Sequence, residues 1–201
     1  MSAQAQPRLS PEEYLQIERA ATTRSEYFNG RMYAMVGGTF NHGCIIGNLI
    51  GELHAAFKKT TCRVVPNDVK VRVASDGLYT YPDIVAVRGK PEFADGEKDV
   101  LVNPALIIEV LSPSTEAYDR GFKAVQYRKL PSLQEYALVS QAEARIELFR
   151  RQAAGDWLLA EYAGKDALCR FTSVHAEMAL TDVYDRIVFE PQDPLSPHPG
   201  Y

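Results

Sequence analysis

The sequence predicts one α/β or α+β domain, in which helices pack on a mixed β-sheet. Three observations support this class: one long segment with helical periodicity, one nearly continuous apolar strand in mid-chain, and several short strands between turn residues. The length of 201 residues fits a single domain that needs no disulfide or structural metal to hold its core. We expect the domain to cover residues 10–190, between a disordered lead, residues 1–9, and a proline-rich tail, residues 191–201.

The N-terminal third predicts a short helix, a hairpin and a long helix. The motif SPEE begins with Ser10, which can cap a helix that continues to about Ala21. Asn29-Gly30 is a strong turn signal and predicts a hairpin over residues 26–35. Apolar residues then recur at helical spacing over residues 41–59, which predicts the one long helix.

The rest of the chain predicts short strands and one further helix. The strands are expected at Arg63–Val65, Val69–Val73, Tyr81–Val87, Ala105–Leu111, Glu135–Val139, Arg145–Phe149 and Trp157–Tyr162, with a weaker one near Phe171. Asp76-Gly77 predicts a turn, and the polar residues 88–103 predict a surface loop. A helix is expected from Thr115 to Leu130, where Pro131 stops it.

Composition narrows the classes of function. The chain carries 22 basic and 26 acidic residues, a net charge of −4, which argues against a broad basic face for nucleic acid. It leaves open an enzyme that contacts a polyanion locally through a metal. The three cysteines, Cys44, Cys62 and Cys169, form no CxxC pair, so we expect neither a zinc site nor a disulfide framework. Without a signal peptide or a long apolar run, we expect a cytoplasmic protein with no membrane partner.

One carboxylate interrupts an otherwise apolar strand. Glu109 lies within Ala105–Leu111, and a strand of that composition is expected to be buried on both faces. A carboxylate there is costly unless a cation or strong donors compensate for it. Glu109 is therefore either a functional ligand or a structural acid that pairs with an arginine or caps a loop.

Asp83 repeats the pattern at the start of the apolar segment Tyr81–Val87. An acid at that place can cap a turn, or it can act together with Glu109. Hard divalent cations such as Mg²⁺ prefer carboxylate and carbonyl oxygens. Asp83, Glu109 and the backbone carbonyl of Val110 could supply such a set.

The helix after the Glu109 strand offers a cation, Lys123. It shares a helix face with Glu116, Asp119, Gln126, Tyr127 and Leu130. Such a mixed face indicates more than a solvated stripe, although Asp119 and Lys123 could form an ordinary surface ion pair. His42, at the start of the long helix, could contact a phosphate or could cap the helix.

Three segments carry a family resemblance. They are IIEVLSPSTEAYDRGFKAVQYRKLPSLQEYALV from Ile107 to Val139, SEYFNGRMYAMVGGTFNHGCIIGNLIGEL near the N-terminus, and YPDIVAV at Tyr81–Val87. These segments resemble the Uma2 family of endonucleases (DUF820-like), a branch of the PD-(D/E)XK, or restriction-endonuclease-like, superfamily. The resemblance covers roughly residues 9–162.

The resemblance implies a restriction-endonuclease-like mixed sheet flanked by helices and a metal site on adjacent strands. Asp83 and Glu109 match the two acids of the superfamily motif. The usual lysine two residues after the second acid is absent, because Leu111 stands there. Its role is implied for Lys123 on the next helix, and Glu26 resembles an additional N-terminal acid.

The implied activity is the hydrolysis of phosphodiester bonds in DNA with Mg²⁺ or Mn²⁺. Lys123 would orient the attacking water or stabilise the transition state, and Gln126 and Tyr127 would be substrate-side or supporting groups. A homodimer would suit the cleavage of both strands of a duplex. Two alternatives remain at this point: a catalytically silent module that binds nucleic acid or protein, and a structural domain whose acids form a buried polar network.

Overall fold

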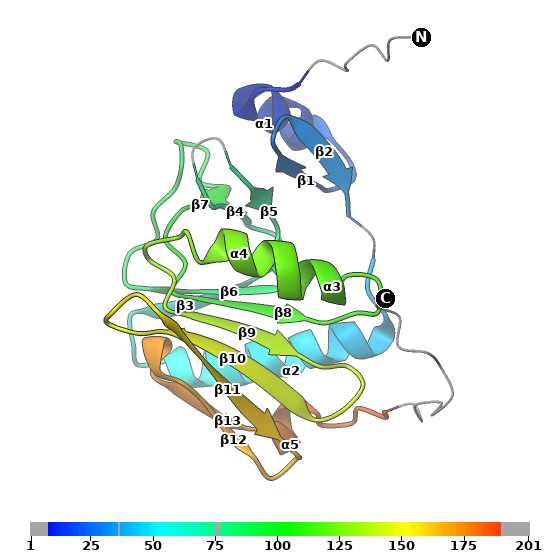
Figure 1. The fold of residues 1–201 in the computed structure, drawn as a ribbon, viewed down its shortest axis with the longest axis vertical. Coiled ribbons are helices and arrows are strands. Elements are labelled where there is room, and N and C mark those ends of the chain that lie inside the picture. Colours follow the sequence, from blue (N-terminus) through cyan, green and yellow to red (C-terminus); the bar gives the residue numbers. More distant parts are fainter. Residues whose placement is uncertain (1–7, 36, 75–76, 190–201) are drawn as a thin grey trace.

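The computed structural model describes residues 8–35, 37–74 and 77–189 (Figure 1). The predicted tail lies outside these residues, as do most of the predicted lead and Asp76 of the predicted turn. The proposed limits of the domain therefore stay a prediction. In the part of the chain that is described, no helix is long and apolar enough to cross a membrane.

The central sheet has six strands in the order β11-β10-β9-β8-β6-β3. They are β3 (Cys62–Pro66), β6 (Ile84–Arg88), β8 (Leu106–Val110), β9 (Glu135–Val139), β10 (Arg145–Arg151) and β11 (Trp157–Ala163). β8 and β9 pair in parallel and the other neighbours pair antiparallel, so the predicted mixed sheet is confirmed.

Two smaller sheets complete the β-structure. Five strands in the order β2-β1-β5-β4-β7 form one of them, drawn above the central sheet in Figure 1. They are β1 (Ser25–Phe28), β2 (Arg31–Ala34), β4 (Lys70–Arg72), β5 (Tyr79–Thr80) and β7 (Val100–Leu101). The predicted hairpin is confirmed as β1–β2, with Asn29 and Gly30 at positive φ. β12 (Leu168–Phe171) and β13 (Ala176–Ala179) form the third sheet.

The helices pack on both larger sheets: the first lies on the five-stranded sheet, and the longer ones cover the two faces of the central sheet. They are α1 (Pro11–Ala20), α2 (Phe40–Phe57), α3 (Glu116–Tyr118), the π-helical η1 (Asp119–Lys123), α4 (Ala124–Tyr127), the short 3₁₀-helix η2 (Thr172–Val174) and α5 (Leu180–Val183). The segments α3, η1 and α4 follow one another without a break, and we call residues 116–127 the site helix. Figure 1 shows α2 on one side of the central sheet and the site helix on the other.

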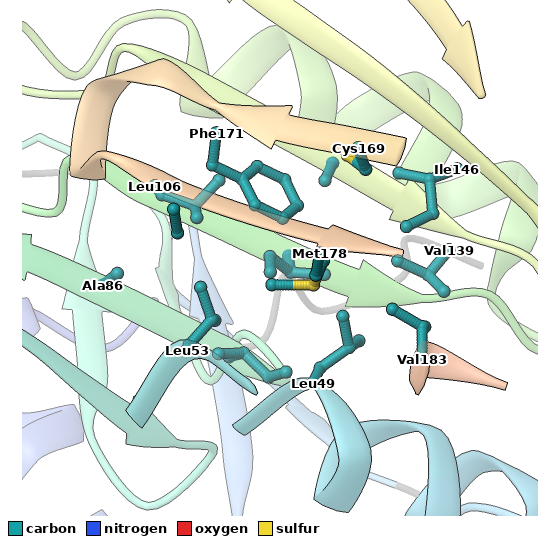
Figure 2. Packing of buried hydrophobic residues seen from close by; sticks show 14 of the residues in the cluster. Leu49, Leu53, Ala86, Leu106, Val139, Ile146, Cys169, Phe171, Met178 and Val183 are labelled. Carbon is teal, nitrogen blue, oxygen red and sulfur yellow. The ribbon is translucent and has the colours of Figure 1, made fainter. Parts of the chain in front are cut away.

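The alternation of side chains along β8 divides the core between these two faces. Leu106 and Ile108 pack with α2, whereas Ile107 packs with the site helix. Figure 2 shows Leu49 and Leu53 of α2 in the first cluster, together with Phe171 and Met178 of the β12–β13 sheet. Every residue of β8 is buried, as the apolar run predicts. Glu109 has the parity of Ile107 and so faces the site helix.

Several predicted boundaries are wrong, each for a physical reason. The strand expected at Tyr81–Val87 begins only at Ile84, because the chain crosses between two sheets here and Pro82 has no N–H for a ladder. Asp83 therefore precedes the strand. The loop expected at 88–103 contains β7, which pairs in parallel with β4 and buries Val100 and Leu101.

The helix expected from Thr115 to Leu130 is regular only to Tyr127 and contains the π-helical turn η1. β13 and α5 were not predicted. Their apolar residues, Met178 and Val183 among them, are buried in the cluster that contains α2.

Glu135, the first residue of β9, shows how this fold accommodates a structural carboxylate. It is 0% exposed and accepts a hydrogen bond from Arg150 Nε at 2.7 Å. The backbone N–H groups and hydroxyls of Thr172 and Ser173 also donate to it, at 2.5 to 3.1 Å. Glu135 thus fastens η2 to the central sheet.

We predict that Glu135→Gln lowers the stability of the fold, because it removes the buried charge that Arg150 and the donors of Thr172 and Ser173 surround. The expected loss is about 3 kcal/mol, or roughly 10 °C in Tm. Thermal unfolding followed by circular dichroism measures it. A variant that melts within about 2 °C of the parent would contradict this structural role.

Candidate active site

Backbone hydrogen bonds hold Asp83 and Glu109 in place where β6 and β8 pair. The pairing of Ile84 with Ile108 brings the two acids opposite each other at the end of the ladder. The backbone N–H of Asp83 donates to Glu109 Oε2 at 3.2 Å, and the N–H of Val110 donates to Asp83 Oδ2 at 2.8 Å. Each carboxylate is therefore held by the backbone of the strand opposite, and their relative position is fixed.

The second oxygen of Glu109 faces the site helix. Glu109 Oε1 accepts hydrogen bonds from the Tyr127 hydroxyl at 2.7 Å and from Lys123 Nζ at 3.1 Å. Lys123 and Tyr127 are four residues apart, so they share the helix face that packs on the sheet. Tyr127 is fully buried, so its ring belongs to the core while its hydroxyl contacts Glu109.

Lys123 contacts three carboxylates from different parts of the fold. Its Nζ lies 3.1 Å from Glu109 Oε1, 3.1 Å from Asp119 Oδ1 and 3.4 Å from Glu26 Oε1. Asp119 and Lys123 are both buried, so the alternative of a surface ion pair is wrong. They are the first and last residues of η1, and π-helical turns within helices are frequent at functional sites.

Glu26 brings the smaller sheet into the cluster. It lies on β1, is buried, and accepts hydrogen bonds from the Thr80 and Tyr118 hydroxyls. Asp83, Glu109, Lys123, Glu26 and Asp119 together form what we call the acidic cluster. Asp119 was not singled out as a site residue, although its place four residues before Lys123 on the same helix face was a signal.

His42 closes the cluster from the side of α2. Its Nε2 lies 3.2 Å from Asp83 Oδ2, and the ring also hydrogen-bonds the backbone carbonyl of Val110. Burial lowers the pKa of His42, but the bonds to Asp83 and Val110 outweigh it, so the pKa is raised overall. Thr39 caps α2 by accepting from the N–H of His42, and a Cβ at Gly38 would lie 2.6 Å from His42 Nδ1. This close backbone approach fixes the imidazole.

Gln126 is not brought to the acidic cluster by any contact in the described residues. It is buried, and its side-chain oxygen accepts from Lys129 Nζ at 2.7 Å. Solvent reaches the acidic cluster at Asp83 and His42, whose side chains are 16% and 15% exposed, against 3% for Glu109.

The cluster holds more negative than positive charge. Four carboxylates, those of Glu26, Asp83, Glu109 and Asp119, surround one lysine and one histidine. The pKa of Glu109 is raised to about 8 overall. Burial is the largest cause and the charges of Asp119 and Asp83 add to it, whereas Lys123 and the hydrogen bond from Tyr127 lower it. Burial also raises the pKa of Asp119. The surplus of negative charge favours a cation or a proton in the cluster.

The donors present fit a hard divalent cation. Among the described residues, no three His, Cys, Asp or Glu side chains are arranged to hold a metal ion together. Mg²⁺ needs fewer, since one or two carboxylates suffice when water and substrate phosphate complete the coordination. Asp83, Glu109 and the Val110 carbonyl offer only oxygen atoms, the ligands that such an ion prefers.

The mixed sheet flanked by helices places the chain in the class of restriction-endonuclease-like folds. The chain matches the Uma2 family model, described as "Putative restriction endonuclease", over residues 11–181, and therefore belongs to the Uma2 family. The description of this family points to a nuclease.

The chain is also similar to two curated relatives and to one solved structure. The chain is 38% identical over 183 residues to the uncharacterized protein slr1290 of Synechocystis sp. (strain ATCC 27184 / PCC 6803 / Kazusa), covering 91% of this chain and 95% of the relative. It is 34% identical over 164 residues to the uncharacterized protein sll1609 of the same organism, covering 82% and 93%. A crystal structure of "a putative nuclease belonging to DUF820" from Anabaena variabilis ATCC 29413 superposes with a TM-score of 0.71 at 18% identity. The match covers 90% of this chain and 99% of that one, and it confirms the predicted fold.

The raised pKa of Glu109 predicts a pH dependence of stability in metal-free protein. The folded state keeps a proton that the unfolded chain releases near pH 4.5, so the unfolding free energy falls as pH rises from about 4.5 to about 8. Glu109→Gln cannot lose this proton. We therefore expect the parent to lose a few degrees more in Tm than Glu109→Gln between about pH 6 and about pH 8.5.

Differential scanning calorimetry in EDTA measures this difference. Glu135→Gln is the matched control, because Glu135 is equally buried but lies among donors. Parallel Tm curves for the parent and Glu109→Gln would show that Glu109 ionises normally.

Proposed function

We propose that the protein is a divalent-metal-dependent endonuclease that hydrolyses phosphodiester bonds of DNA. The observation that carries the proposal is the backbone-locked pair Asp83 and Glu109, which faces Lys123 inside a cluster with surplus negative charge. A purely structural network would pair its acids with cations, as Glu135 does with Arg150. The cluster instead leaves its acids undercompensated, which favours a ligand over a structural role.

Asp83, Glu109 and the Val110 carbonyl would hold Mg²⁺ or Mn²⁺. Such an ion, when bound, lowers the pKa of a coordinated water and offsets the charge of the phosphate. The chain's own residues set the geometry, because the cross-strand hydrogen bonds fix both carboxylates before any ligand arrives. His42 orients Asp83 on the side that is open to solvent.

Lys123 would donate to the attacking water or to a non-bridging phosphate oxygen. Its ammonium group has three protons and contacts three carboxylates, so a donor becomes available when one carboxylate turns to another partner. Glu26 and Asp119 would keep the ammonium group charged and in place. The pKa of Lys123 is raised, because these acids and Glu109 outweigh the effect of burial.

A catalytically silent binding module is the second candidate. The net charge of −4 favours it, since a composition with more acidic than basic residues argues against an extended basic face that binds nucleic acid. This module would bind its partner without any dependence on Asp83 or Glu109.

A homodimer would be the natural form of the enzyme if it cuts both strands of a duplex.

A cleavage assay separates these candidates. We expect nicking of supercoiled plasmid that requires Mg²⁺ or Mn²⁺, stops in EDTA, and is abolished in Glu109→Gln and Asp83→Asn. Lys123→Met should cost on the order of 10²–10³ in rate, the usual effect of losing a transition-state donor. Glu135→Gln, assayed well below its Tm, is the control and should keep the activity of the parent.

Equal cleavage by Asp83→Asn, Glu109→Gln and the parent would refute the assignment of the site. A parent that binds DNA but cuts none with either metal would favour the binding module.

A further inference from the structure

A polar pocket lies at the end of the central sheet opposite to the acidic cluster. Its volume is about 550 Å³, and its wall includes Arg88, Ser132, Glu135, Arg150 and Arg151. Arg88 ends β6 and Glu135 begins β9, whereas the acidic cluster lies before β6 and at the end of β8. A strand of five residues spans about 17 Å, so the pocket and the acidic cluster lie about that far apart along the central sheet.

The charged side chains that line the pocket leave a net positive charge. Arg150 pairs with the buried Glu135, and Glu92 is the other acid in the wall. Arg88 and Arg151 form no ion pair with any residue that the structure describes. Three arginines against two acids leave a net charge of +1 in the pocket, while the whole chain has −4. An anion is therefore the favoured ligand here.

One hydrogen-bonding group in the wall is unused. The Oγ of Ser132 is shielded from solvent and has no hydrogen-bond partner among the described residues. A shielded hydroxyl without a partner costs free energy, and rotation of the Ser132 side chain toward the pocket would let a ligand oxygen recover it. Ser132 and the arginines thus offer the mixture of charged and neutral donors that phosphate oxygens accept.

We propose that this pocket binds a phosphate-bearing ligand through Arg88, Arg151 and Ser132. Its volume exceeds that of a single ion and falls in the range of small-molecule sites, roughly 300–1,000 Å³. The phosphate belongs to a small molecule or to the backbone of a nucleic acid. The pocket is remote from Asp83 and Glu109, so the proposal stands or falls independently of the nuclease activity.

Arg88 and Arg151, the two arginines without an ion pair among the described residues, differ in their contacts within the protein. Arg151 donates to the backbone carbonyls of Arg128, Leu130 and Leu133, so it also holds the turn after the site helix. Arg88 is exposed, and no such internal contact accounts for it among the described residues. Arg88 is therefore the residue whose substitution tests the pocket without loosening the fold.

The test is calorimetric titration of the metal-free protein, in EDTA and at constant ionic strength, with sodium pyrophosphate and with a short single-stranded oligonucleotide. Arg88→Gln and Ser132→Ala remove pocket donors. Arg31→Gln is the matched control, because Arg31 is an exposed arginine on β2, in another sheet. Loss of a charged hydrogen bond predicts roughly tenfold to hundredfold weaker binding in Arg88→Gln and less in Ser132→Ala.

Pyrophosphate binding that Arg88→Gln weakens and Arg31→Gln leaves unchanged would support a small-molecule phosphate. Binding of the oligonucleotide alone, with the same dependence on Arg88, would support a backbone phosphate at the same site. Absence of binding by either probe, or equal weakening by Arg31→Gln, would overturn the proposal.

Discussion

The ammonium group of Lys123 lies between carboxylates from three parts of the fold, and the burial of the acidic cluster depends on it. Glu109 comes from the central sheet, Glu26 from the smaller sheet and Asp119 from the site helix itself. Carboxylates this close repel one another, and removal from water adds to the cost. A single cation that touches all three therefore joins both sheets and a helix at one point. It leaves the cluster short of positive charge, and this shortage makes a further cation favourable there.

Two buried glutamates on neighbouring strands show why burial alone does not identify function. Glu135 accepts five hydrogen bonds from one arginine and from Thr172 and Ser173, and no second carboxylate of the described residues forms an interaction with it. Glu109 accepts three and shares its lysine with other acids. The surroundings therefore suit a structural role for Glu135 and the proposed ligand role for Glu109. The two ends of the central sheet differ in the same way, with surplus negative charge at one and uncompensated arginines at the other.

The sequence predicts local features of this fold well, because they depend on neighbouring residues. The hairpin at Asn29-Gly30, the long helix and the apolar strand around Glu109 all follow from turn chemistry or periodicity. The parallel pairing of β7 with β4 and the break between β5 and β6 depend on distant parts of the chain, and no local pattern encodes them. The same division holds in the site: the strand position of Glu109 is a local signal, whereas the burial of Asp119 and its meeting with Glu26 at Lys123 arise only from tertiary packing.

In the proposed function, the acidic cluster is an electrostatically undercompensated site for a divalent cation. Titration of Mn²⁺ into the protein at about pH 7, repeated in buffers of different ionisation enthalpy, counts the protons released when the ion binds. We predict one bound ion and the release of close to one proton, because Glu109 with a pKa of about 8 is protonated before the ion arrives. We also predict that Glu109→Gln and Asp83→Asn lose this binding while Glu135→Gln keeps it. Mn²⁺ that fails to bind, or that binds equally well to Glu109→Gln, would contradict the account.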